Sequence, residues 1–142
     1  MTRRNGFTLV ELVVVILILG ILAGVAAPKM FSTSAAATDN GLRQTLSVVR
    51  DAIELYVAQQ GALPTCTGTG SDFRGFLKSY IRGPFPTSPV GQTDFDVKPV
   101  TGLTTVNQAD DSTGWMYNTQ TGEFIANCTG TSPVDGTAYS AF

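Results

Sequence analysis

The chain begins with an almost unbroken run of apolar residues. Within Phe7–Ala27 only Thr8 and Glu11 are polar. As a helix rising 1.5 Å per residue, this run is about 30 Å long, which is the thickness of the hydrocarbon core of a bilayer. The pattern therefore predicts a membrane-spanning or export segment. Two preceding arginines, Arg3 and Arg4, are expected to keep the N-terminus on the cytoplasmic side.

A second apolar pattern follows, with the spacing of an amphipathic helix. Its members recur every three or four residues: Leu42, Leu46, Val49, Ile53 and Tyr56 or Val57. Gly61 and Pro64 predict where this helix ends. If both stretches form one helix from Phe7 to Gln60, it is about 80 Å long. Its front half then has no core of its own chain to pack against, so we expect it to lie in lipid or against other copies.

Residues 62–142 are predicted to form a loop-rich part with a small antiparallel sheet. Glycine and proline punctuate residues 62–92, where "FRGFLKSYI" predicts a short helix, and "FDVKPV" alternates as a strand does. The stretch "GWMYNTQTGEFIAN" predicts a hairpin that turns near Gly122. Trp115 and Tyr117 are expected on one face of it for core packing, and Met116 on the other. The predicted fold class is α+β, with a long N-terminal helix packed on this sheet.

Composition excludes several classes of function. The chain has no histidine, which removes the commonest general base and metal ligand. Its formal net charge is −2 and its basic residues after Lys29 are scattered singly, so we predict no nucleic-acid binding. No glycine-rich phosphate loop follows a predicted strand. The sequence therefore predicts neither an enzyme nor a bound cofactor.

The two cysteines, Cys66 and Cys128, lie 62 positions apart and form no CxxC motif. Their spacing excludes zinc-ribbon and c-type haem sites. In an exported domain, an even number of cysteines favours one disulfide. Two unpaired buried thiols are the alternative.

Four aspartates offer oxygen atoms of the kind that calcium prefers: Asp94, Asp96, Asp110 and Asp111. Their spacing matches no EF-hand loop. Because Asp94 and Asp96 alternate with Phe95, they are expected on one face of the chain. The simpler interpretation is that this face is solvated.

Glu11 is the unexpected residue of the apolar run. A charge at the centre of a membrane helix costs roughly 2.5–3.5 kcal/mol on insertion scales, so it usually has a function. Two ordinary interpretations of the run are a signal peptide cleaved near Ala26 or Ala27 and an uncleaved anchor. Neither of them gains from a carboxylate at this position.

The stretch "GFTLVE", with its short basic leader, resembles the processing site of type IV pilins and of the pseudopilins of type II secretion. The resemblance implies that a prepilin peptidase cuts after Gly6 and that the new N-terminal residue, Phe7, is N-methylated. Glu11 occupies the place of the family's carboxylate, fifth after the cut. Residues 1–6 are then a leader, 7–28 a transmembrane and polymerisation helix, 29–61 its amphipathic continuation, and 62–142 the globular part.

Physical reasoning gives Glu11 a role in such a protein. Cutting after Gly6 leaves a charged amine on Phe7, one helical turn from Glu11. We expect Glu11 to neutralise this amine in its own subunit or in a neighbouring one, which would set the stagger of packed helices. Gly20 and Gly24 form a small-xxx-small pair that permits close helix approach. Pro28 removes a donor to the Gly24 carbonyl and predicts a weak point in the helix.

The resemblance implies a structural subunit that polymerises into a type IV pilus or a type II secretion pseudopilus. The stretch "YIRGPFPTSPVG" is similar to a loop of the major pseudopilin, a protein that often binds calcium nearby. The expected partners are copies of the chain, prepilin peptidase, an inner-membrane assembly platform, minor pilins or pseudopilins, and lipid before assembly. The expected location is the inner membrane for the precursor, and then a periplasmic or extracellular filament. The alternative is a secreted or membrane-anchored binding domain.

Overall fold

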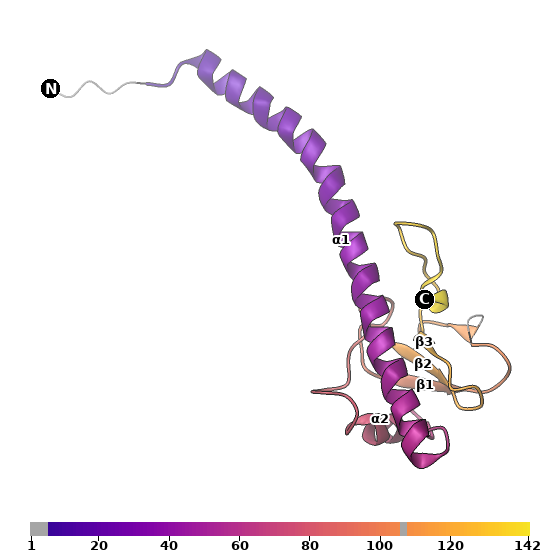
Figure 1. Ribbon diagram of the computed structural model, residues 1–142. Coiled ribbons are helices and arrows are strands. Elements are labelled where there is room, and N and C mark those ends of the chain that lie inside the picture. Colours follow the sequence, from indigo (N-terminus) through magenta and orange to yellow (C-terminus); the bar gives the residue numbers. More distant parts are fainter. Residues whose placement is uncertain (1–5, 106–107) are drawn as a thin grey trace. The chain divides into compact units, whose positions relative to one another are not determined.

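The computed structural model describes residues 6–105 and 108–142, so most of the predicted leader lies outside the described residues. The chain divides into two compact units, residues 1–34 and residues 35–142. The elements are α1 (Leu9–Gln60), α2 (Ser71–Leu77), β1 (Val97–Val100), β2 (Trp115–Asn118), β3 (Phe124–Ala126) and a short 3-10 helix, η2 (Tyr139–Ala141) (Figure 1). The predicted α+β class is confirmed.

In the second unit, α1 contributes one face to the core. The stripe expected from the spacing of apolar residues is buried, and it includes Leu42, Leu46, Val49 and Ile53. The helix ends where the sequence predicts. Gly61 adopts a left-handed conformation with φ of 74°, which favours glycine, and its N–H donates to the Val57 carbonyl at 2.8 Å.

The sheet has the order β1-β2-β3 and is mixed, whereas the sequence pattern predicted an antiparallel one. The hairpin is confirmed, because β2 pairs antiparallel with β3 and Met116 lies opposite Ile125. Gly122 is in its turn with φ of 78°. β1, however, pairs parallel with β2. The 14 residues from Thr101 to Gly114 separate these two strands, which is enough chain for the return that a parallel pair requires.

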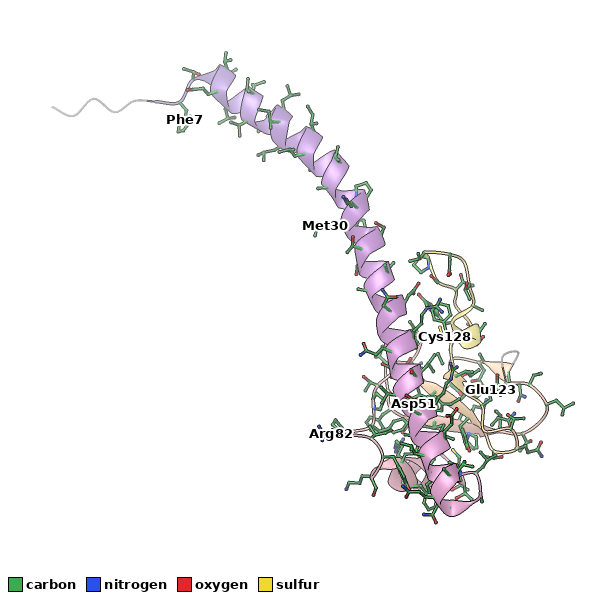
Figure 2. All side chains as sticks on the ribbon, viewed as in Figure 1. Phe7, Met30, Asp51, Arg82, Glu123 and Cys128 are labelled. Atoms are coloured by element: carbon green, nitrogen blue, oxygen red, sulfur yellow. The ribbon has the colours of Figure 1, made fainter. Side chains whose placement is uncertain are left out.

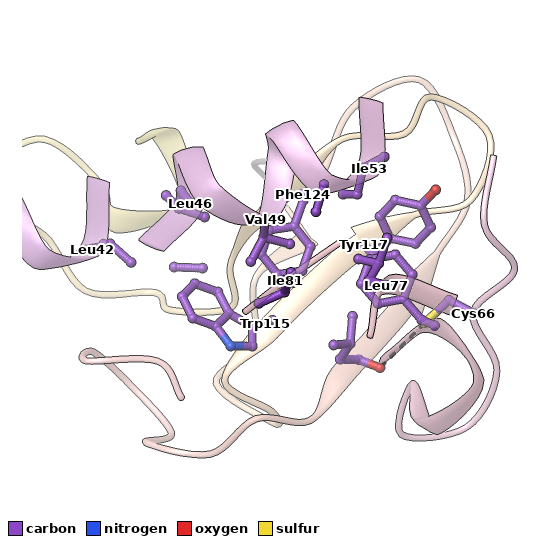
Figure 3. Close-up of a cluster of buried hydrophobic side chains, with 14 of the residues drawn as sticks. Leu42, Leu46, Val49, Ile53, Cys66, Leu77, Ile81, Trp115, Tyr117 and Phe124 are labelled. Carbon is purple, nitrogen blue, oxygen red and sulfur yellow. Dashed lines mark hydrogen bonds between the residues drawn. The ribbon is translucent and has the colours of Figure 1, made fainter. Parts of the chain in front are cut away.

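Aromatic rings fill the space between the sheet and the two helices. Trp115 and Tyr117 lie on the core side of β2, as predicted (Figure 3). Phe73 of α2 is buried in the same cluster and contacts the rings of Tyr117 and Phe124. The ring centroids of Phe73 and Tyr117 are 4.4 Å apart, and those of Trp115 and Phe124 are 5.3 Å apart. Met116 is also fully buried, although it is not part of this cluster. The aromatic residues therefore join α2 to the sheet.

Polar residues of α1 hold the C-terminal segment in place. The Arg50 guanidinium donates to the carbonyl oxygens of Phe124, at 3.0 Å, and Phe142, at 2.8 Å. The Ser132 hydroxyl donates to the buried carboxylate of Asp39. Both side chains project from the helix toward residues more than 70 positions away in the sequence. They therefore add long-range polar links to a core whose local pattern is apolar.

Candidate functional site

The first turn of α1 is closed by two residues. Glu11 Oε2 accepts hydrogen bonds from the backbone N–H and from the hydroxyl of Thr8, both at 2.8 Å. The backbone N–H of Glu11 donates to Thr8 Oγ1 at 3.2 Å. This reciprocal pair is a capping box, which satisfies N–H groups that have no partner within the helix. The structure therefore gives Glu11 a partner in the uncut chain.

Thr8 is a residue of the site that the sequence analysis missed. Its signal is the pattern Thr-x-x-Glu directly before the apolar run, which is typical of a helix N-terminus. Glu11 lies one turn from Phe7, where peptidase cleavage would leave an amine. The pairing of Glu11 with that amine stays a prediction, because it concerns the cut chain.

Every described residue of the first unit is exposed. This holds for residues 6–34, and Phe7 is 89% exposed and Ile21 62%. Apolar side chains project from all sides of this part of α1 (Figure 2). The helix is long and apolar enough to cross a membrane, and none of its most apolar 18-residue window is buried. Such a surface requires lipid or protein to cover it.

Gly20 lies in a shallow hollow of this surface, between Val13, Ile16, Leu17 and Ile21. A Cβ atom added at Gly20 or at Gly24 would meet nothing within 4 Å. Neither glycine is therefore needed for packing within the chain. Both are available for the close helix approach predicted from their spacing.

Pro28 lies inside α1, so the helix does not end at the apolar run. One turn later, the hydroxyls of Ser32 and Thr33 both donate to the carbonyl oxygen of Lys29, at 3.0 and 2.9 Å. Side-chain hydroxyls that bond back to the helix backbone compete with its regular ladder. Pro28 has no N–H to donate to the helix ladder, so the Gly24 carbonyl lacks its regular partner at this point of α1.

The predicted disulfide is absent, because Cys66 and Cys128 are both free and buried. The two thiols lie beside different parts of the sheet. Cys66 Sγ is 3.8 Å from the carbonyl oxygen of Val97 in β1. Cys128 Sγ accepts a hydrogen bond from the N–H of Gly130, beyond the end of β3. The even cysteine count was thus misleading, and the alternative of two buried thiols is what the structure shows.

The aspartates proposed as calcium ligands do not gather into a site. Among the residues that the structure describes, no three His, Cys, Asp or Glu side chains are placed to hold a metal ion. Two of the aspartates are paired with cations instead. Asp96 accepts from Arg74 at 2.7 Å, and Asp110 accepts from Lys98. The other two, Asp94 and Asp111, accept backbone N–H groups from neighbouring loops.

Asp110 is expected to make stability depend on pH. Hydrogen bonds from Lys98, Ser112 and Asn127 hold the pKa of this carboxyl well below its usual range. Because the pKa of Asp110 is lower in the folded state, its carboxylate stabilises the fold at every pH above its pKa in the unfolded chain, which is about 4. This stabilisation is lost as the pH falls from about 4 toward the pKa of Asp110 in the folded protein. Asp110→Asn should therefore unfold at a lower temperature than wild type near pH 7.

The difference between Asp110→Asn and wild type should shrink as the pH falls below about 4. Thermal unfolding of both full-length proteins in detergent, followed by the fluorescence of Trp115, measures it. Asp51→Asn is the matched control, because within the described residues the Asp51 carboxylate has no ion-pair partner. A difference that stays constant from about pH 7 to about pH 3 would contradict the prediction.

Comparison with known proteins bears on the N-terminal segment and on the whole chain. Residues 1–27 match the family model of the prokaryotic N-terminal methylation motif. The chain is 30% identical over 125 residues to prepilin peptidase-dependent protein D of Escherichia coli K12, and this match covers 83% of the chain and 84% of the relative. No solved structure matches the chain.

Two further relatives match over a shorter range. The chain is 38% identical over 64 residues to the type IV narrow pilus major component PilA5 of Thermus thermophilus, which covers 45% of the chain and 55% of that protein. It is 34% identical over 65 residues to the type II secretion system core protein G of Klebsiella pneumoniae, which covers 46% of each. The match thus spans about half the length of these two relatives. Because the match to protein D spans most of both chains and the methylation motif is present, the chain belongs to the type IV pilin and pseudopilin family.

Proposed function

We propose that this protein is a structural subunit that polymerises through the first part of α1 into a filament. The observation that carries the proposal is the complete exposure of residues 6–34, most of which are apolar. In the precursor, lipid covers this surface, because the helix can span a bilayer. In the filament, the same surface packs against the helices of other copies.

Processing connects these two states. The name of protein D states that it depends on a prepilin peptidase, and the corresponding cut in this chain follows Gly6. Removal of the leader takes Arg3 and Arg4 from the chain and creates the Phe7 amine within reach of Glu11. An inner-membrane assembly platform would then move the subunit from the membrane into the filament, with minor pilins or pseudopilins as further partners.

The chain matches relatives that are named for two different uses. One is named as a pilus component, and another as a secretion-system core protein. Filament formation is the property that these uses share. The filament would be extracellular in a pilus and periplasmic in a pseudopilus. Immunogold labelling of intact cells separates the two, because only a surface pilus is labelled without opening the outer membrane.

The N-terminus of the protein from its native cell envelope tests the proposal. Intact-mass and N-terminal peptide analysis should find a chain that begins at Phe7, with or without a methyl group on its nitrogen. Sheared or detergent-extracted material should contain the same form in filaments. A chain that begins near Ala27 or Pro28 would mean an ordinary signal peptide, and polymerisation through the removed helix would then be excluded.

A further inference from the structure

Two exposed cations of the globular unit have no ion-pair partner among the described residues, whereas Arg50 is half-buried and donates to backbone oxygens. Arg43, Arg74 and Lys98 each form an ion pair within the chain. Lys78 and Arg82 are exposed, and neither forms an ion pair with any residue that the structure describes. They lie four positions apart, directly after α2. This corner of the molecule is therefore a small surface of uncompensated positive charge.

Lys78 stands at the edge of an apolar groove. The groove has a volume of about 370 Å³, and its lining comes from α2 and the following loop together with Phe95. The apolar part of the lining includes Leu77, Ile81 and Phe85. Phe95 is 48% exposed although it is a large aromatic residue. No carboxylate of the described chain lines this groove, so an apolar group with a negative neighbour would suit it.

The outward face of α1 carries the complementary chemistry. Asp51, Glu54, Leu55 and Ala58 are spaced by three and four positions, so they share the face opposite the buried stripe. Leu55 is 53% exposed. Asp51 and Glu54 are exposed, and they too have no ion-pair partner among the described residues. We call this set the acidic face of α1.

We propose that the groove beside Lys78 receives the acidic face of α1 from a second copy of this chain. Leu55 of one copy enters the apolar groove of the next, and Asp51 and Glu54 pair with Lys78 and Arg82. The contact joins two different surfaces, so it is heterologous. A heterologous contact that does not close into a ring repeats into a helical filament. The proposal rests on the proposed function and names the contact between globular units.

Charge complementarity is the main argument for a second copy as the occupant. The corner after α2 holds two cations without an ion-pair partner in the described chain, and the apolar groove lies beside it. The acidic face of α1 holds two such carboxylates, and the exposed side chain of Leu55 lies beside them. Exposed pairs contribute little individually, but they fix register and suppress wrong partners. Repetition at every subunit makes even a weak contact matter for the whole filament.

Zero-length cross-linking in mixed filaments tests the contact between molecules. One full-length chain carries Lys78→Arg, which keeps the charge but removes the amine that a carbodiimide couples. The other carries Asp51→Asn and Glu54→Gln, which remove the target carboxylates. When both are produced in one cell, an amide between Lys78 and Asp51 or Glu54 can form only between two different chains. Mass spectrometry of the sheared filaments should find this cross-linked peptide.

The outcomes separate the two proposals. If filaments form but Lys78 couples to other carboxylates or to none, the groove contact is overturned and the filament function stands. If neither chain is found in filaments, although each is cleaved and inserted, the proposed function itself fails.

Charge reversal gives an independent readout in the native host. Lys78→Glu should lower filament yield about tenfold, because it places like charges together at every contact. Combining Lys78→Glu with Glu54→Lys should restore most of the yield, while Glu54→Lys alone should lower it. All of these positions are exposed, so thermal unfolding in detergent should be unchanged. A double variant no better than the single ones would overturn the pairing.

Discussion

Glu11→Gln is expected to abolish filaments while leaving cleavage after Gly6 and membrane insertion intact. Glutamine can still accept the hydrogen bonds that Thr8 donates to Glu11, so the capping box is kept. The charge that would neutralise the Phe7 amine is lost. Leaving a buried charge without its partner costs about 3–5 kcal/mol. Filament yield from a host lacking the wild-type copy should therefore fall by about a hundredfold or more.

Thr8→Ala is the matched control for Glu11→Gln. It removes the hydroxyl from the capping box but keeps the carboxylate, so it should weaken the first helical turn by only about 1 kcal/mol and leave filament yield close to wild type. Sheared filaments and the cleaved subunit are measured in the same cultures. If Glu11→Gln assembles normally and Thr8→Ala does not, Glu11 acts as a helix cap and the charge-pairing role is wrong.

Phe73→Ala is expected to have the largest effect on the stability of the globular unit. Phe73 is fully buried and contacts the rings of Tyr117 and Phe124, so truncation leaves a cavity at the centre of the core. Truncations of this kind cost about 3–5 kcal/mol. The midpoint of urea unfolding of the full-length protein in detergent should fall accordingly. Trp115, the single tryptophan, reports the transition by its fluorescence.

Phe76→Ala provides the comparison on the same helix. Phe76 lies three positions further along α2, is 41% exposed and meets the ring of Tyr56 at 5.7 Å. Its truncation should cost only about 1 kcal/mol, because it removes one ring contact and leaves no enclosed cavity. Equal losses from both variants would show that α2 is not anchored through Phe73.

The sequence predicts those parts of the fold that depend on neighbouring residues. The buried stripe of α1 follows from helical spacing, and its end follows from Gly61, whose conformation favours glycine. The hairpin of β2 and β3 follows from alternation around a turn. The parallel pairing of β1 with β2 could not be predicted in this way, because it depends on how the 14-residue connection between them returns. The links from Asp39 and Arg50 to the C-terminal segment are equally non-local.

The candidate site was foreseen in part. Glu11 stands out because a carboxylate in an apolar run is costly, and Thr8 could have been found from its spacing to Glu11. The cysteines and aspartates show the limit of counting residue types. Whether two thiols form a bond depends on how close they lie, and whether aspartates bind a metal depends on which cations are nearer. Asp110 forms an ion pair with Lys98, and Asp96 forms one with Arg74. No pattern in the sequence indicates these pairs.

The free thiols affect how the globular unit folds and how it responds to reductants. Burial raises the pKa of Cys66 to about 12, and burial also raises the pKa of Cys128. At neutral pH both remain protonated, and a protonated thiol is a poor nucleophile in thiol–disulfide exchange. No disulfide has to form when this unit folds, so folding requires neither a thiol oxidase nor a disulfide isomerase. A reductant such as dithiothreitol has no disulfide to break in this unit. The stability of the unit should therefore be the same with and without the reductant, because it comes from the apolar core.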